Sequence, residues 1–249
     1  MKSYIPNAIT LTNLFLGCLA SVFAAKGHLE IAAFLVFAGI LCDFFDGLAA
    51  RALKVQSAIG IQLDSLADLI TCGLVPGLVL FQLLSINVEN TLVLHYGSDW
   101  NTDGVEIVLL SLAGFLVTLA SAYRLAKFNI DEDQLSSFTG LPTPANALFI
   151  LSFPLILEYQ SNDLINSIIL NPWFLISVTL VSAIMLNARV KLFALKFSDW
   201  SFTANAIKYI FLLLSLVLLV VLQFAAIPLI IVLYVVLSVL DHRAKSSRG

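Results

Sequence analysis

The sequence carries unusually little charge. Only 12% of its 249 residues are charged and 60% are hydrophobic, whereas a soluble domain has about 25% charged residues. The mean hydropathy is +0.98. A net charge of −3 offers no broad basic surface, so we expect no nucleic-acid partner. These deficits exclude an ordinary soluble domain and predict a protein of the lipid bilayer.

Cysteine and histidine are also scarce, with three residues of each. Cys18, Cys42 and Cys72 all lie in apolar runs, which favours small buried hydrophobic residues over a disulfide or a zinc site. The histidines are scattered without the spacing of metal ligands.

The first apolar stretch lacks a small-residue cleavage site, so we expect it to stay in the protein as a first span.

Long polar stretches are missing as well, and apolar stretches fill most of the chain. A span needs about 20 mostly apolar residues, and eight stretches meet or approach that length. We therefore expect an all-α fold, a polytopic membrane helix bundle of about eight transmembrane helices. The fifth stretch is the shortest and the last two are joined by a tight turn at 225–228, so a count of seven stays open. The stretches are 7–26, 29–52, 58–86, 105–128, 144–159, 171–188, 205–223 and 225–241.

The basic residues support an even number of spans. With eight spans and a cytoplasmic N-terminus, 12 of the 13 lysines and arginines fall on one side of the membrane, and only Lys26 falls on the other. The side rich in basic residues is the cytoplasmic one. Both chain ends are therefore expected in the cytoplasm, and the protein in the cell's inner membrane.

Four aspartates interrupt the apolar pattern. Asp43 and Asp46 lie in the second stretch, and Asp64 and Asp68 in the third. A charge at the membrane centre costs at least about 2.5–3.5 kcal/mol, which makes such residues candidates for function. Four neighbouring carboxylates cannot all stay ionised without cations. Hard oxygen ligands favour magnesium or manganese, with calcium as an alternative.

The spacing of these aspartates places them on two helix faces. Residues three, four and seven or eight positions apart share one face of a helix. The connection over 52–58 is short, so the two helices are expected to be antiparallel neighbours with the carboxylates at similar depth. The small residues on each face leave room for a ligand. One face carries Asp43, Asp46, Gly47 and Ala50, and the other carries Gly60, Asp64 and Asp68.

Two other interpretations of the aspartates stay open at this point. A buried aspartate can pair with Arg51 or act as a polar packing group between helices. Intramembrane carboxylates also line the ion and proton pathways of transporters.

Residues 43–68 fit the pattern D-x2-D-G-x2-A-R-x8-G-x3-D-x3-D at all eight fixed positions. The segment closely resembles the signature of the CDP-alcohol phosphotransferases. Segments 6–13, 68–76, 124–129 and 139–144 are similar to one branch of that family, the membrane-embedded enzymes that use L-serine as acceptor. The resemblance implies a single domain over 1–249, with a catalytic core over about 1–188 and additional helices over about 205–241.

The resemblance also implies roles for the signature residues. Two divalent cations would be held by all four aspartates, and Asp68 would also act as general base. The lipid substrate would be CDP-diacylglycerol, the surroundings membrane lipids, and the assembly a homodimer. For Asn7 and Thr10, helix capping or polar packing is an equal alternative. The residues implied in CDP-lipid binding are Gly47, Ala50, Arg51, Ser57, Gly60, Asn7 and Thr10.

An L-serine acceptor requires a cation for its carboxylate. Arg124, Lys127 and Asn129 lie at the cytoplasmic end of the fourth stretch, and we expect them to bind it. Anchoring at the membrane surface is the alternative for both basic residues. Glycerol phosphate or inositol phosphate are the alternative acceptors, but they would want a larger basic cluster. The loop over 140–142 is either a lid or a simple connector.

Overall fold

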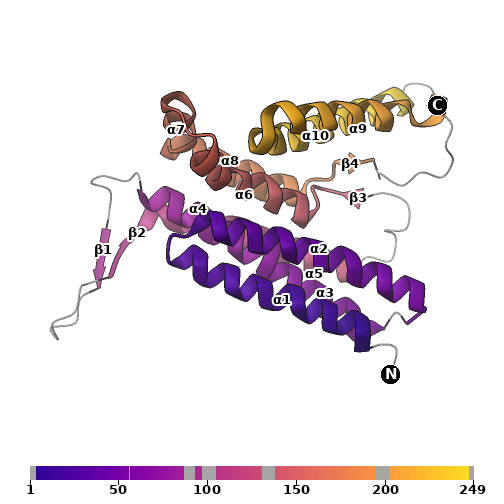
Figure 1. The fold of residues 1–249 in the computed structure, drawn as a ribbon, viewed down its shortest axis with the longest axis horizontal. Helices are drawn as coiled ribbons and strands as arrows, with labels where there is room; N and C mark the ends of the chain where they lie inside the picture. Colours follow the sequence, from indigo (N-terminus) through magenta and orange to yellow (C-terminus); the bar gives the residue numbers. More distant parts are fainter. Residues whose placement is uncertain are drawn as a thin grey trace.

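The computed structural model describes residues 4–55, 57–86, 93–96, 105–130, 138–193 and 202–246. The fold is an elongated bundle of helices (Figure 1), as the apolar stretches predicted. The beginning of α1 and the end of α10 lie at the same end of its long axis. The helices in the first half are α1 (Tyr4–Ala25), α2 (Leu29–Leu53), α3 (Ala58–Asp68), the π-helical turn η1 (Leu69–Leu74), α4 (Val75–Ile86), the 3₁₀ turn η2 (Leu109–Gly114) and α5 (Phe115–Ile130).

The second half adds a further layer of helices (Figure 1). Its helices are α6 (Thr143–Tyr159), α7 (Asp163–Ile169), α8 (Pro172–Asn187), α9 (Phe202–Leu222), the 3₁₀ turn η3 (Gln223–Ala225) and α10 (Ala226–Ser246). Two short antiparallel strand pairs lie at opposite ends of the bundle: β1 (Val93–Tyr96) with β2 (Val105–Val108), and β3 (Phe138–Thr139) with β4 (Lys191–Leu192).

Within the described residues, five helical segments are long and apolar enough to cross a membrane, and a sixth is obtained if α7 and α8, bent by 55°, form one span. With 17 residues, α6 is shorter than a typical span of about 20. The chain is therefore a polytopic membrane protein, and the count of eight spans stays a prediction.

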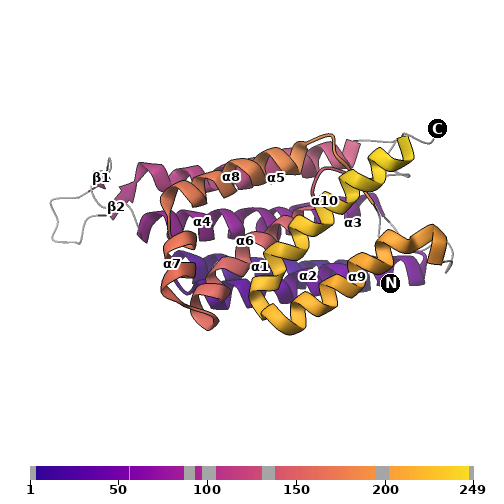
Figure 2. The same ribbon diagram turned by 90° about the horizontal axis from the view of Figure 1, so that it is seen from above.

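Two expected boundaries were wrong. Residues 105–108 form β2, so the fourth helical segment begins at Leu109. The break between the last two stretches falls at Gln223–Ala225, where Gln223 adopts a left-handed φ of 48°, and not at 225–228. Figure 2 shows α9 and α10 diverging from this turn as two separate helices.

The core lies among α1, α2, α4, α6 and α8. Its largest fully buried side chains include Leu80, Leu84, Ile150 and Leu155. The segment α3–η1–α4 is the most buried of the candidate spans, and α9–α10 is the least buried. Asp68, which is buried at the end of α3, therefore leads directly into the most buried segment of the bundle.

Local rules explain the connection between α2 and α3. Lys54 takes the left-handed conformation (φ 55°), and its N–H bonds to the carbonyls of Ala50 and Arg51, which ends α2. Ser57 then caps α3, because its Oγ accepts a hydrogen bond from the N–H of Gly60 at 3.1 Å. A serine directly before an apolar helix is a typical N-cap residue. The principal packing partner of both helices is α1, and α2 and α3 approach each other through the carboxylates of Asp43, Asp46 and Asp64.

Candidate metal and active site

Three carboxyl groups converge at one point. Asp43 and Asp46 on α2 and Asp64 on α3 each offer an oxygen, and these oxygens all lie within 4.8 Å of one another. Asp46 is only 6% exposed. The one-face spacing within each helix is what allows side chains from two helices to meet.

Asp68 lies beside this trio, at the last residue of α3. It is 8% exposed and interacts electrostatically with Asp46 and Asp64. Its Oδ1 has no hydrogen-bond partner within the described part of the chain. The buried Asn13 side chain, from α1, approaches the same carboxylate. A buried carboxylate oxygen without a protein partner is available to a ligand, a substrate or a proton.

Thr10 links α1 to the carboxylates. Its hydroxyl lies within hydrogen-bond reach of Oδ2 of Asp46 and 3.0 Å from the carbonyl of Pro6. A hydroxyl has one proton to donate, so donation to Asp46 leaves the Pro6 carbonyl as a close neighbour. Thr10 thereby fixes the orientation of one carboxylate, a role that the sequence analysis did not foresee.

The N-terminus of α3 forms a narrow polar corner. A Cβ atom on Gly60 would lie 3.1 Å from Oγ of Ser57 and 3.3 Å from Oδ1 of Asn7. Glycine is therefore what lets the Asn7 side chain approach the cap of α3. A helix N-terminus favours anionic groups, so this corner suits a phosphate.

Arg51 lies over the glycine of the signature. Its guanidinium nitrogens are 3.7 and 3.8 Å from the position that a Cβ on Gly47 would occupy. Arg51 is exposed, whereas Gly47 and Ala50 are half-buried. An exposed guanidinium one turn from the carboxylates is free to bind phosphate oxygens.

Of the three residues expected to bind the acceptor, the structure brings Arg124 to the carboxylates. Arg124 interacts electrostatically with Asp68, and its buried Nε has no hydrogen-bond partner within the described residues. Lys127 is exposed. Asn129 joins α5 to α3, accepting from Ser65 Oγ at 3.0 Å and donating to Gln62 at 3.2 Å.

The π-helical turn η1 directly follows Asp68 and was not expected from the sequence. Turns of this kind are frequent at functional sites. Thr118 on α5 donates to the carbonyl of Gly73 at 3.0 Å, and a Cβ on Gly73 would lie 3.1 Å from that of Ser121. Close packing of α5 on η1 thus supports the irregular backbone next to Asp68.

The loop that begins at Gly140 is fixed at the end of α8. Gly140 and Leu141 donate backbone hydrogen bonds, each of 2.9 Å, to the carbonyls of Val190 and Met185. Gly140 has a φ of 77°, and a Cβ there would lie 2.5 Å from the carbonyl oxygen of Leu186. These contacts are those of a connector, the second of the two interpretations considered for this loop.

The donor set fits a hard divalent cation. Three carboxylates from two helices supply oxygens that lie within 4.8 Å of one another, and oxygen ligands are the ones that magnesium and manganese prefer. Like charges this close in a buried site need a counter-cation to stay ionised. Asp68, with its unpartnered oxygen, is placed to complete such a site or to act beside it.

Comparison with known families identifies the family of this chain. The family model for CDP-alcohol phosphatidyltransferases matches residues 3–240, so the chain belongs to this family of membrane transferases. The signature aspartates lie within the matched region.

The similar proteins share one printed name, CDP-diacylglycerol–serine O-phosphatidyltransferase. The chain is 34% identical over 157 residues to the protein of that name from Bacillus subtilis, covering 61% of this chain and 76% of the relative. It is 30% identical over 165 residues to that of Methanocaldococcus jannaschii, covering 66% of each. It is also 30% identical over 148 residues to the Helicobacter pylori protein, covering 59% of this chain and 55% of the relative.

Proposed function

We propose that this chain is the enzyme that transfers the phosphatidyl group of CDP-diacylglycerol to L-serine, yielding phosphatidylserine and CMP. The observation that carries the proposal is the convergence of Asp43, Asp46 and Asp64 beside Asp68, with the spacing of the family signature. The name shared by the relatives adds support for serine as the acceptor.

The aspartates take two roles in this proposal. Asp43, Asp46, Asp64 and Asp68 hold two divalent cations, magnesium or manganese. Bound there, the cations would neutralise charge on the diphosphate and orient the attacking and leaving oxygens. The Thr10 hydroxyl keeps Asp46 in its ligating orientation.

Asp68 is the proposed general base. It accepts the proton of the serine hydroxyl as that oxygen forms a bond to the phosphorus of the phosphatidyl group. The bond from this phosphorus to the oxygen of CMP breaks, and CMP leaves. A positioned base contributes about 10²–10⁴ in rate, and the unpartnered oxygen of Asp68 has capacity for that proton.

The diphosphate and nucleotide are proposed to bind around the N-terminus of α3. Arg51 binds phosphate oxygens, with Gly47, Ala50 and Gly60 leaving room for them. Ser57 would donate its O–H to a phosphate oxygen, while its Oγ accepts the capping hydrogen bond from the N–H of Gly60. Asn7 and Thr10, near the start of α1, are the proposed contacts to the cytidine.

Arg124 is proposed to bind the serine carboxylate. Its buried guanidinium lies next to Asp68 and has a free Nε–H within the described residues, so one end of the amino acid would be held while its hydroxyl faces the base. Lys127 attracts the substrate from the exposed surface. Asn129 positions α3 against α5 through its two hydrogen bonds.

The proposal includes a place in the cell. We propose that the active site faces the cytoplasm at the inner membrane, where soluble serine and CMP can exchange, and the distribution of basic residues supports this orientation. We also propose a homodimer, on the family resemblance.

An acceptor panel tests the proposal. Purified protein is given CDP-diacylglycerol with L-serine, ethanolamine, glycerol phosphate or inositol phosphate, and CMP release is measured. We expect L-serine to drive CMP release and ethanolamine, which lacks the carboxylate, to be a poor acceptor. Release driven by glycerol phosphate or inositol phosphate instead would refute the serine assignment while leaving the reaction class intact. No CMP release with any alcohol would refute the class.

A further inference from the structure

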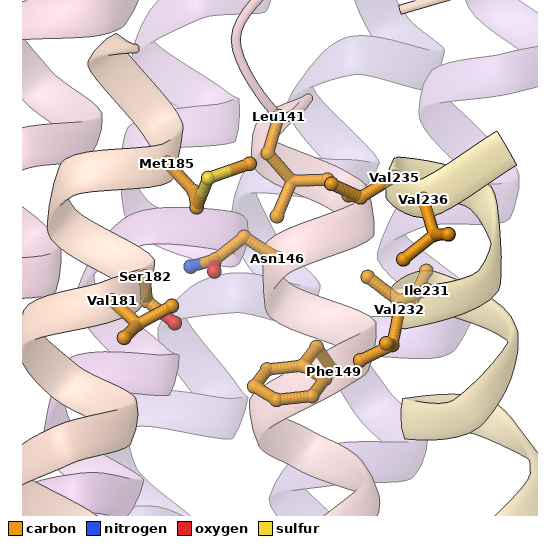
Figure 3. Close-up of a pocket in the computed structure, with 10 residues that line it drawn as sticks. All are labelled: Leu141, Asn146, Phe149, Val181, Ser182, Met185, Ile231, Val232, Val235 and Val236. Carbon is orange, nitrogen blue, oxygen red and sulfur yellow. The ribbon is translucent and has the colours of Figure 1, made fainter. Parts of the chain in front are cut away.

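A pocket of about 170 Å³ lies between α6, α8 and α10, away from the aspartates. Its walls are almost wholly apolar, and Figure 3 shows them meeting around a central space. α6 separates α10 from α2, packing on both (Figure 1), so the pocket lies across α6 from the helix that carries Asp43 and Asp46. The residues lining it are Leu141, Asn146, Phe149, Val181, Ser182, Met185, Ile231, Val232, Val235 and Val236.

Asn146 is the unusual member of this lining. It is fully buried, and neither its Nδ2 nor its Oδ1 has a hydrogen-bond partner within the described residues. An amide donor buried without a partner is strongly disfavoured, more so than an acceptor. In Figure 3 the amide faces Met185 and Ser182 across the gap between α6 and α8. An occupant that accepts a hydrogen bond would satisfy this amide.

The pocket opens toward lipid. Val181 on α8 and Val232 and Val236 on α10 line it and are 59%, 52% and 47% exposed. In a chain that crosses the membrane, surfaces this apolar face hydrocarbon. An occupant can thus enter sideways from the bilayer.

The polar and apolar parts of the pocket follow one another along α6. Asn146 is one turn from the start of α6, and Phe149 and Val232 lie on the side of Asn146 that is away from Leu141 (Figure 3). A glycerolipid has the same order, with an ester carbonyl near the interface and the acyl chain below it. Met185 lies beside the amide and is unbranched, so it can move aside.

We propose that this pocket binds one acyl chain of a resident bilayer glycerophospholipid, whose ester carbonyl accepts a hydrogen bond from Nδ2 of Asn146. The lipid is a bound structural component rather than the reacting substrate, since α6 stands between the pocket and α2. It fills the gap between the α6–α8 layer and α10, which is the least buried part of the bundle. The proposal does not depend on the proposed reaction.

Photocrosslinking tests the site directly. The full chain is placed in bilayers containing phosphatidylglycerol with a diazirine in one acyl chain, and the adducts are mapped by mass spectrometry. We expect adducts at Met185 and Val235 in excess over Ile184 and Leu229, which are 66% and 47% exposed and do not line the pocket.

Two variants separate the pocket from the general lipid surface. Val235→Trp fills the pocket and should lower the Met185 adduct, while the matched Leu229→Trp, on the same helix, should not. Asn146→Leu keeps the volume and removes the donor. It should lower the Met185 adduct about 3- to 10-fold, the range of one lost hydrogen bond, without lowering thermal stability in detergent, because no protein partner is left unpaired.

Three results would overturn the proposal. Equal adduct yields at Met185 and Ile184 in all variants would show that the pocket holds no particular lipid. Crosslinks between two copies of the chain at Met185 would make a second copy the occupant. Displacement of the probe by equimolar CDP-diacylglycerol, but not by equimolar unlabelled phosphatidylglycerol, would assign the pocket to the substrate.

Discussion

The hydroxyl of Thr10 on α1 donates a hydrogen bond to Oδ2 of Asp46 on α2, and both residues are almost completely buried. The first helix thereby holds a carboxylate of a signature that begins 33 residues later, at Asp43. Partners of this kind fix the orientation of metal ligands and raise metal affinity.

Thr10→Val removes the donor and keeps the shape of the side chain. We expect the magnesium concentration for half-maximal CMP release to rise about 10- to 100-fold, the typical effect of losing such a partner. Thr10→Ser retains the hydroxyl and should restore most of the affinity. An unchanged magnesium requirement in Thr10→Val would show that this hydrogen bond does not support the metal site.

Asp68→Asn should reduce turnover more than it reduces binding of CDP-diacylglycerol. The amide cannot accept the serine proton, and a loss of about 10²–10⁴ in turnover is expected. The other three aspartates still converge, so the CDP-lipid should still raise the melting temperature in the presence of magnesium.

Asp163→Asn, at the exposed start of α7, is the matched control and should leave both quantities unchanged. Near-normal turnover in Asp68→Asn would exclude Asp68 as the base. Loss of turnover and of CDP-lipid binding in equal measure would make it mainly a metal ligand.

Arg124→Ala should raise the KM for serine and leave CDP-lipid binding nearly unchanged. Removing one partner of a buried charge pair costs about 2–4 kcal/mol, or about 30- to 700-fold in KM. Arg124→Lys should recover only part of this, because the planar fork of the guanidinium is lost. Arg189→Ala, at an exposed arginine that follows α8 and has no proposed role in the site, is the control and should leave the serine KM unchanged. A serine KM that stays the same in Arg124→Ala would leave Arg124 as a membrane anchor.

Cysteine labelling tests the orientation in the membrane. In a background without Cys18, Cys42 and Cys72, a cysteine at Ser57 should react with an impermeant reagent from the cytoplasmic side only. A cysteine at Ser161, between α6 and α7 at the opposite end of the bundle (Figure 1), should react from the other side. Asp99 is expected on that same side but lies outside the described residues. Labelling of both positions from one side would contradict the three spans, 58–86, 105–128 and 144–159, that are expected between them.

Much of the site could be predicted because it depends on local rules. Helical periodicity was enough to place Asp43 with Asp46, and Asp64 with Asp68, each pair on one face. The cap at Ser57 followed from its position before an apolar helix. Runs of apolar residues located the helices, since a bilayer imposes their length and composition.

The remaining features depend on packing between distant segments. The π-helical turn after Asp68 relies on Thr118 and Ser121 of α5, and no local preference of residues 69–74 announces it. The bond from Thr10 to Asp46 requires α1 to lie against α2. The break at Gln223 occurs inside a continuous apolar run, where hydropathy alone marks no boundary.

The most direct test of the account is a balance of products with and without metal. Purified protein receives CDP-diacylglycerol and labelled L-serine, and both CMP and labelled phosphatidylserine are quantified. We predict that the two products form in equal amounts, that excess chelator abolishes both, and that magnesium or manganese restores both. Full product formation in excess chelator, or CMP release without labelled phosphatidylserine, would contradict the account.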